Sequence, residues 1–135
     1  MHDEVRVSIT TDRDVVVARQ KGRALATEVG LTKTEATLLA TAVSEVARNI
    51  IQYAGEGHIV LTRISLNGRE GVCVVARDSG PGIASVDLAL ASDQSSGAGG
   101  GMGLPGARRL MDAFQIESEA GKGTVVKMTK WRSRQ

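Results

Sequence analysis

A glutamate and an asparagine four residues apart are the first candidates for chemistry in this sequence. Glu45 and Asn49 lie in a segment with helical periodicity, where a spacing of four places both side chains on one face, one turn apart. A carboxylate and an amide oxygen so placed can hold Mg²⁺ through direct and water-mediated contacts, or activate a hydroxyl group. The alternative is an ordinary solvated helical face, with Arg48 and Gln52 as companions.

A second candidate is the turn DSGPGI at residues 78–83, which follows the most apolar strand-like segment. The carboxylate of Asp78 can accept a hydrogen bond from the exocyclic amine of a nucleobase. Gly80 and Gly82 carry no side chain, so a flat ring could approach the backbone closely. An ordinary Asp-Gly-Pro turn has the same composition, and the turn by itself leaves both interpretations open.

The third candidate is the glycine-rich segment GAGGGMGLPG at residues 97–106. Residues 101–106 match the dinucleotide fingerprint G-x-G-x-x-G, but that motif must follow a strand, and the preceding ASDQSSGAGG has no strand propensity. A Walker A loop ending at residues 121–124 fails because Ile116 replaces its first glycine. Neither standard phosphate loop therefore fits.

The end of this segment nevertheless predicts an anion site. Gly103 and Leu104 lead directly into a helix whose first turn contains Pro105, which needs no N–H there. Free backbone N–H groups and the positive end of the helix dipole meet at such a start. The glycine-rich residues before it could fold over a ligand, and a disordered linker is the alternative.

Hydrophobic periodicity indicates the elements that must position these candidates. The predicted order begins with a strand over 4–10, a helix from Val15 to a stop at Gly30, and a helix over 32–55 with a capping box at Thr32 and Glu35. Strands over 58–66 and 71–78 and a weak helix over 86–90 follow. The last predicted elements are a helix from Leu104, with Ala107, Leu110, Met111 and Phe114 on one face, and a closing hairpin around 121–123. The expected fold is an α/β (α+β) two-layer sandwich, with one mixed sheet and helices mainly on one face. Residues 1–135 are expected to form one domain.

Composition excludes several functional classes. Aromatic residues make up 2% of the chain and the net charge is +2, which argues against a nucleic-acid surface built on base stacking. The single cysteine, Cys73, is interpreted as a buried core residue in a reducing compartment. A start without signal-peptide features, and no apolar run of about 20 residues, indicate a cytoplasmic protein without membrane insertion. The cationic residues near the C-terminus are interpreted as a solvated tail: Lys127, Lys130, Arg132 and Arg134.

The candidates also occur in a specific order along the chain: E-x-x-x-N at 45–49, D-x-G-x-G at 78–82, G-x-G-L at 101–104 and G-x-G-T at 121–124. This set resembles the N, G1, G2 and G3 boxes of the GHKL superfamily of ATPases and kinases, whose ATP site is the Bergerat fold. The resemblance spans essentially the whole chain. Segments such as AVSEVARNIIQYAGEG and GLPGARRLMD are most similar to the RsbT type of switch-protein serine/threonine kinase in bacterial stressosome signalling.

The resemblance implies a role for each matching residue. Glu45 is the implied general base, Asn49 the implied ligand of the Mg²⁺ that bridges the ATP phosphates, and Asp78 the reader of the adenine amine, helped by a water near Thr124. Residues 84–101 are the implied ATP lid. The implied nucleotide contacts are Asn49, Asp78, Gly80, Gly82, Ile83, Gly99, Gly101, Met102, Gly103, Leu104 and Thr124.

The resemblance also implies a function and partners. An RsbT-type kinase uses ATP to phosphorylate STAS-domain proteins, the RsbS-like antagonist and the RsbR-like scaffold, and after release activates an RsbU-like PP2C phosphatase. The chain shows no phosphoacceptor histidine helix, which argues against a sensor histidine kinase. Two alternatives remain: an anti-sigma factor kinase of the RsbW or SpoIIAB type, and a non-catalytic module in which nucleotide only sets the conformation of the lid.

Overall fold

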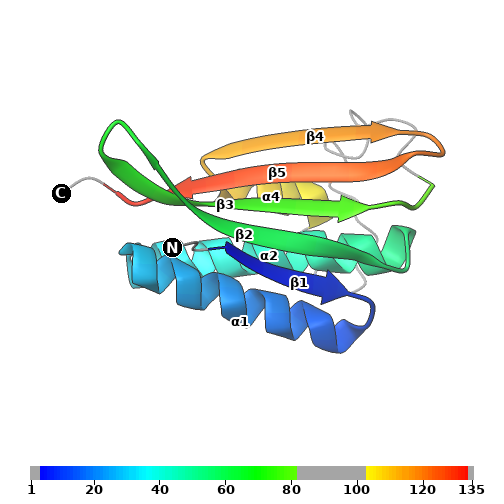
Figure 1. Ribbon diagram of the computed structural model, residues 1–135, viewed down its shortest axis with the longest axis horizontal. Helices are drawn as coiled ribbons and strands as arrows, with labels where there is room; N and C mark the ends of the chain where they lie inside the picture. The colour runs from blue at the N-terminus through cyan, green and yellow to red at the C-terminus, as the bar shows by residue number, and fades with distance from the viewer. Residues whose placement is uncertain (1–3, 82–102, 134–135) are drawn as a thin grey trace.

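The computed structural model describes residues 4–81 and 103–133, and these form a sheet covered by helices (Figure 1). The predicted segments 84–101 and 86–90 lie outside the described residues. The elements in chain order are β1 (Glu4–Ile9), α1 (Asp12–Val29), α2 (Lys33–Tyr53), β2 (Gly57–Leu66), β3 (Arg69–Asp78), α4 (Gly103–Leu110), β4 (Ala113–Glu119) and β5 (Gly123–Trp131).

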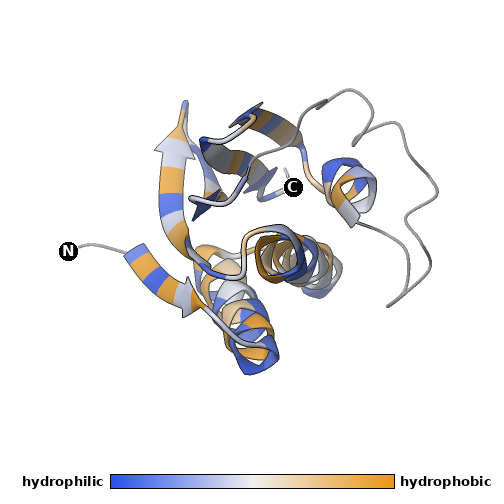
Figure 2. Ribbon diagram, turned by 90° about the vertical axis from the view of Figure 1, so that its right-hand side faces the viewer, coloured by the Kyte–Doolittle hydropathy of each residue, from blue (hydrophilic) through white to orange (hydrophobic). Residues whose placement is uncertain are grey.

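The five strands form one sheet in the order β1-β2-β3-β5-β4, and every neighbouring pair is antiparallel. The prediction of a mixed sheet was therefore wrong for the described strands. Tight turns join β2 to β3 and β4 to β5, and such turns can connect only antiparallel strands. Between β1 and β2 the chain runs through two helices instead of one, so β2 returns antiparallel to β1. The predicted two-layer arrangement is confirmed, because α1, α2 and α4 all lie on one side of the sheet (Figure 2).

The ends of the first two helices follow the local signals in the sequence. Gly30 ends α1 in the left-handed conformation, with φ 101°. At the start of α2 the Glu35 N–H donates to the Thr32 hydroxyl (3.1 Å), and the Thr32 N–H donates to the Glu35 carboxylate (2.7 Å). The predicted capping box is confirmed, and it fixes where α2 begins.

The core lies between the helices and the inward face of the sheet. Alternate strand residues point into it, as expected for a sheet with one covered face. The predicted stripe on α2 is confirmed, since Leu39, Val43, Val46 and Ile50 are all at most 2% exposed. The strand residues that meet these helices are Val7, Ile9, Ile59, Leu61, Val72, Val74, Ala76, Val126 and Met128. Cys73 is also buried, as predicted, although it alternates onto the opposite face of β3.

The last helix is shorter than predicted. α4 ends at Leu110, and Phe114 lies in β4 instead of on the helix. The reason is non-local: the Asp112 N–H donates to the carbonyl of Thr129, and the Asp112 carboxylate accepts from the Trp131 N–H, which draws the chain onto β5. None of the helices in the two described ranges is both long and apolar enough to cross a membrane.

The cationic C-terminal residues are not all solvated. Lys127 and Lys130 belong to β5, and Lys130 is only 9% exposed. Its Nζ donates to the carbonyl of Leu110 (2.9 Å) at the end of α4 and lies 3.6 Å from the Asp112 carboxylate. The interpretation of this region as a solvated tail was wrong for Lys130, because strand alternation turns it inward, in phase with Met128.

Candidate functional site

Glu45 connects α2 to the first residue of α4. Its side chain is 11% exposed. One carboxylate oxygen, Oε1, accepts a hydrogen bond from the Gly103 N–H at 2.9 Å. The other, Oε2, accepts from Nη1 of Arg48 at 2.9 Å, one turn further along α2. A carboxylate therefore occupies the start of α4, where the helix dipole and the free N–H groups attract negative charge.

The position of α4 follows from its apolar residues. Leu104 is 4% exposed and Ala107 fully buried, and both belong to the core cluster. Gly103 adopts a positive φ of 54°, which lets the chain turn into the helix. The predicted helix start at Leu104 is confirmed to within one residue, and it faces α2 at the level of Glu45.

Asn49 lies one turn beyond Glu45 on α2 and is half-buried. In the described part of the chain no three His, Cys, Asp or Glu side chains cluster as a metal site. The donor chemistry of Asn49 nevertheless fits Mg²⁺, because this ion keeps several waters and binds through one or two protein oxygens together with substrate phosphates.

A second polar group lies at one end of the sheet. Asp78 is the last residue of β3 and pairs with Thr124 of β5, which in turn pairs with Ser118 of β4. All three alternate onto the helix side of the sheet, in phase with Ala76, Val126 and Ile116. The Asp78 carboxylate accepts a hydrogen bond from the Gly80 N–H through Oδ1 (3.0 Å), which fixes its orientation.

The hydroxyls of this group form a chain. Ser118 Oγ donates to the carbonyl of Gly123 (3.1 Å) and lies 2.8 Å from Thr124 Oγ1. Because the Ser118 proton is used by Gly123, the proton between the two hydroxyls comes from Thr124. The Thr124 oxygen then presents lone pairs next to Asp78, and a water or an amine can donate to them.

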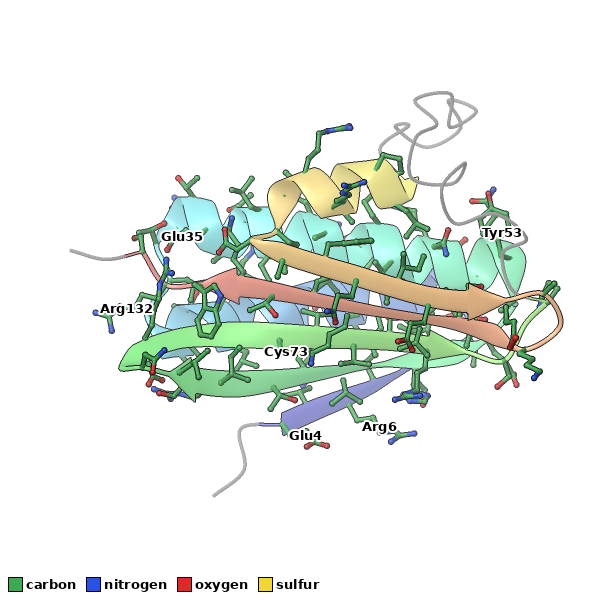
Figure 3. All side chains as sticks on the ribbon, turned by 90° about the horizontal axis from the view of Figure 1, so that it is seen from above. Glu4, Arg6, Glu35, Tyr53, Cys73 and Arg132 are labelled. Carbon is green, nitrogen blue, oxygen red and sulfur yellow. The ribbon has the colours of Figure 1, made fainter. Side chains whose placement is uncertain are left out.

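Close backbone packing brings three elements together at this end. A Cβ on Gly123 would collide with the Asp78 carbonyl, and a Cβ on Gly80 would lie 2.5 Å from the Ala54 Cβ, just past the end of α2. Figure 3 shows Glu35 and Tyr53 at opposite ends of α2, with Tyr53 at the end where β3 finishes. Glu45 is nine residues before Ala54, about 13 Å along the helix at 1.5 Å per residue. The turn after Asp78 therefore meets the C-terminal end of α2, and Asn49 and Glu45 lie further back along that helix.

Part of the predicted site lies outside the described residues: Gly82, Ile83, Gly99, Gly101 and Met102. Sequence reasoning did not assign Ser118 a place in the site, although a hairpin centred on Gly121 places it opposite Thr124. It also treated Arg48 only as part of a solvated face. Arg48 is indeed 46% exposed, but its guanidinium holds Glu45, as the i,i+3 spacing allows.

The chain is similar to several known proteins. Residues 9–130 match the histidine kinase-like ATPase domain. The chain is 42% identical over 131 residues to the serine/threonine-protein kinase RsbT of Bacillus subtilis, covering 97% of this chain and 98% of that protein. It is 34% identical over 127 residues to an anti-sigma F factor of Clostridium kluyveri, covering 90% and 89% of the two chains.

Solved structures share the fold at low sequence identity. The RsbU and RsbW domains of a Mycobacterium tuberculosis protein match with a TM-score of 0.60 and 18% identity, over 97% of this chain and 34% of that one. The mycobacterial sensor histidine kinase MprB matches with a TM-score of 0.54 and 16% identity, over 99% and 100%.

The domain match implies ATP binding, and the 42% identity to RsbT extends over nearly the full length of both chains. The chain belongs to the histidine kinase-like ATPase domain family and, within it, to the serine/threonine-protein kinases of the RsbT type.

Proposed function

We propose that this kinase transfers the γ-phosphoryl group of ATP, with Mg²⁺, to a serine or threonine hydroxyl of a STAS-domain partner of the RsbS or RsbR kind in the cytoplasm. After release it binds and activates an RsbU-like PP2C phosphatase. The observation that carries the chemistry is the Glu45 carboxylate held at the start of α4. The choice of partners rests on the resemblance to RsbT along the whole chain.

The geometry supports a division of roles along α2. The triphosphate lies at the start of α4, near Glu45, and Asn49 supplies an oxygen to the Mg²⁺, which neutralises phosphate charge. Glu45 accepts the proton of the acceptor hydroxyl. The hydroxyl oxygen forms the new bond to Pγ, the bond from Pγ to the bridging oxygen breaks, and ADP leaves with that electron pair.

Asp78 and Thr124 form the end of the site that binds the nucleobase, called the base end below. The free lone pairs of the Asp78 carboxylate accept the adenine amine, and the Thr124 oxygen accepts from a water beside the ring. Gly80 keeps the turn free of side chains, so the ring can lie against the backbone. Guanine presents a carbonyl where adenine has the amine, so we expect this end to favour ATP over GTP.

An anti-sigma factor kinase is the second candidate. It is favoured by the 34% identity to an anti-sigma F factor over most of both chains. Such a protein would bind a sigma subunit stably and phosphorylate an antagonist, whereas an RsbT-type kinase would bind the phosphatase. Both candidates require the same nucleotide site.

The test combines the purified kinase, radiolabelled ATP and a purified STAS-domain protein. We expect label on the STAS protein that requires Mg²⁺, and loss of transfer by at least a hundredfold in Glu45→Ala, since a positioned base typically contributes 10² to 10⁴. Glu28→Gln, which removes an exposed charge on α1, is the control. Wild-type protein that binds ATP without transferring label would instead support the non-catalytic module. Co-elution with a sigma subunit would support the anti-sigma assignment.

A further inference from the structure

The hydrogen bond between Gly103 and Glu45 joins the expected phosphate site to the expected base. We propose that a nucleotide phosphate and the Glu45 carboxylate compete for the Gly103 N–H, so that phosphate binding releases Glu45 to act as the base. This inference rests on the proposed function, because it concerns the control of that same site.

The competition follows from the number of donors. A backbone N–H has one hydrogen, and Gly103 directs it to Glu45 Oε1 at 2.9 Å. Gly103 is the first residue of α4, where a phosphate oxygen would seek the same donor. Two negative groups about 4 Å apart also repel each other. The carboxylate and the phosphate therefore cannot both occupy this position at low cost.

The second oxygen of Glu45 shows where the carboxylate would remain. Oε2 accepts from Arg48 Nη1 at 2.9 Å, on the same helix and independently of α4. The guanidinium is 46% exposed, so it can follow a small movement of the carboxylate. When a phosphate takes the Gly103 N–H, Glu45 stays attached to Arg48 and Oε1 becomes free to accept a proton. Arg48 is thus a positioning residue for the base.

The consequence is an order of events. While Glu45 holds Gly103, each of its carboxylate oxygens already accepts a hydrogen bond from a protein donor. Phosphate binding removes one of these donors. The base is then available only when the group to be transferred is present.

The first experiment measures the affinity for a non-hydrolysable ATP analogue by calorimetry. Removing the competing carboxylate in Glu45→Ala should tighten binding by about fivefold or more, with a smaller gain in Glu45→Gln, whose neutral oxygen is a weaker acceptor. Glu28→Gln removes the same charge elsewhere and should leave the affinity within twofold. Unchanged or weaker binding in Glu45→Ala would overturn the proposal.

A second measurement follows the Gly103 amide signal by NMR in ¹⁵N-labelled protein. The analogue should shift this signal in the wild type, and Glu45→Ala should shift it before any nucleotide is added. If Glu45→Ala leaves the Gly103 signal in place, the hydrogen bond does not control this site and the proposal fails. These readouts need no acceptor protein, so they remain informative even if no phosphoryl transfer is found.

Variants of Arg48 provide a third test, in which analogue affinity and kcat should respond differently. Arg48→Ala should leave analogue affinity within twofold but lower kcat for phosphoryl transfer about tenfold or more, and Arg48→Lys should recover part of it. Tighter analogue binding in Arg48→Ala would contradict this role, because Arg48 would then hold Glu45 on Gly103. Normal transfer by the wild-type protein, together with unchanged analogue affinity in Glu45→Ala, would refute the competition while leaving the proposed function intact.

Discussion

The hydroxyl oxygens of Ser118 and Thr124 lie 2.8 Å apart across β4 and β5, next to Asp78 at the end of β3. Ser118 also donates to the Gly123 carbonyl, so it accepts the proton of Thr124 and fixes the direction of that hydroxyl. Thr124 is 5% exposed, and a buried hydroxyl without such a partner would be free to rotate. In the proposed function, Ser118 thereby orients the acceptor oxygen at the adenine end of the site.

Ser118→Ala should therefore weaken nucleotide binding through the base end alone. Loss of one fixed hydrogen bond corresponds to about 0.5 to 1.5 kcal/mol, or roughly a two- to twelvefold loss of ADP affinity by calorimetry. Binding of inorganic tripolyphosphate should not change, because it contains no base. Ser8→Ala, an exposed serine on β1, serves as the control. Equal losses for ADP and tripolyphosphate would show that Ser118 acts on the whole site and not on the base end.

Two glycines of the β4–β5 connection allow a matched test of the close packing at Asp78. Gly121 and Gly123 both have positive φ, 81° and 89°, so alanine is strained at either position. A Cβ on Gly121 meets nothing within 4 Å, whereas one on Gly123 collides with the Asp78 carbonyl. We expect Gly121→Ala to lower the unfolding free energy by about 1 kcal/mol, and Gly123→Ala by at least 1 to 2 kcal/mol more. Urea unfolding measures both, and similar losses would contradict the contact.

Much of the fold follows from local patterns. The strands, α1, α2 and the capping box at Thr32 depend on residues a few positions apart, and the sequence shows these directly. Phe114 was misplaced because its three-residue spacing from Met111 continues the helical period. Only the hydrogen bonds from Asp112 to β5 end the helix earlier, and they join residues 17 and 19 positions apart in the sequence.

The candidate site residues could be chosen from the sequence by residue type, but their contacts could not. Glu45, Asn49, Asp78 and Thr124 were singled out by their motifs, and the structure places them along α2 and at the end of β3. The bond between Glu45 and Gly103 spans 58 positions, so no local pattern could indicate it. Lys130 differs, because its inward direction follows from alternation with Met128 and could have been predicted.

Lys130 should stabilise the protein by holding the end of α4. Lys130→Met keeps the length of the stem but removes the donor to the Leu110 carbonyl and the charge at the helix C-terminus. We expect a loss of about 1 kcal/mol in unfolding free energy, since the cost of burying the lysine offsets part of its interactions. Lys127→Met, at an exposed position of β5, should change it by less than about 0.5 kcal/mol. A smaller loss in Lys130→Met than in Lys127→Met would show that the buried contact adds nothing.

His58 should make the stability depend on pH. Its pKa is lowered in the folded protein, first by burial and then by the charges of Arg6 and Arg77 on the neighbouring strands. The unfolded chain, with an ordinary pKa of about 6.5, therefore binds more protons as the pH falls. The contribution of His58 is complete above about pH 6.5 and is lost as the pH drops toward the lowered folded value. In urea unfolding between about pH 7.5 and 5.5, the unfolding free energy of His58→Gln should depend less steeply on pH than that of the wild type. Arg77→Gln removes one of the two charges and should show an intermediate dependence. Identical slopes in the wild type and His58→Gln would show that another group controls stability in this range.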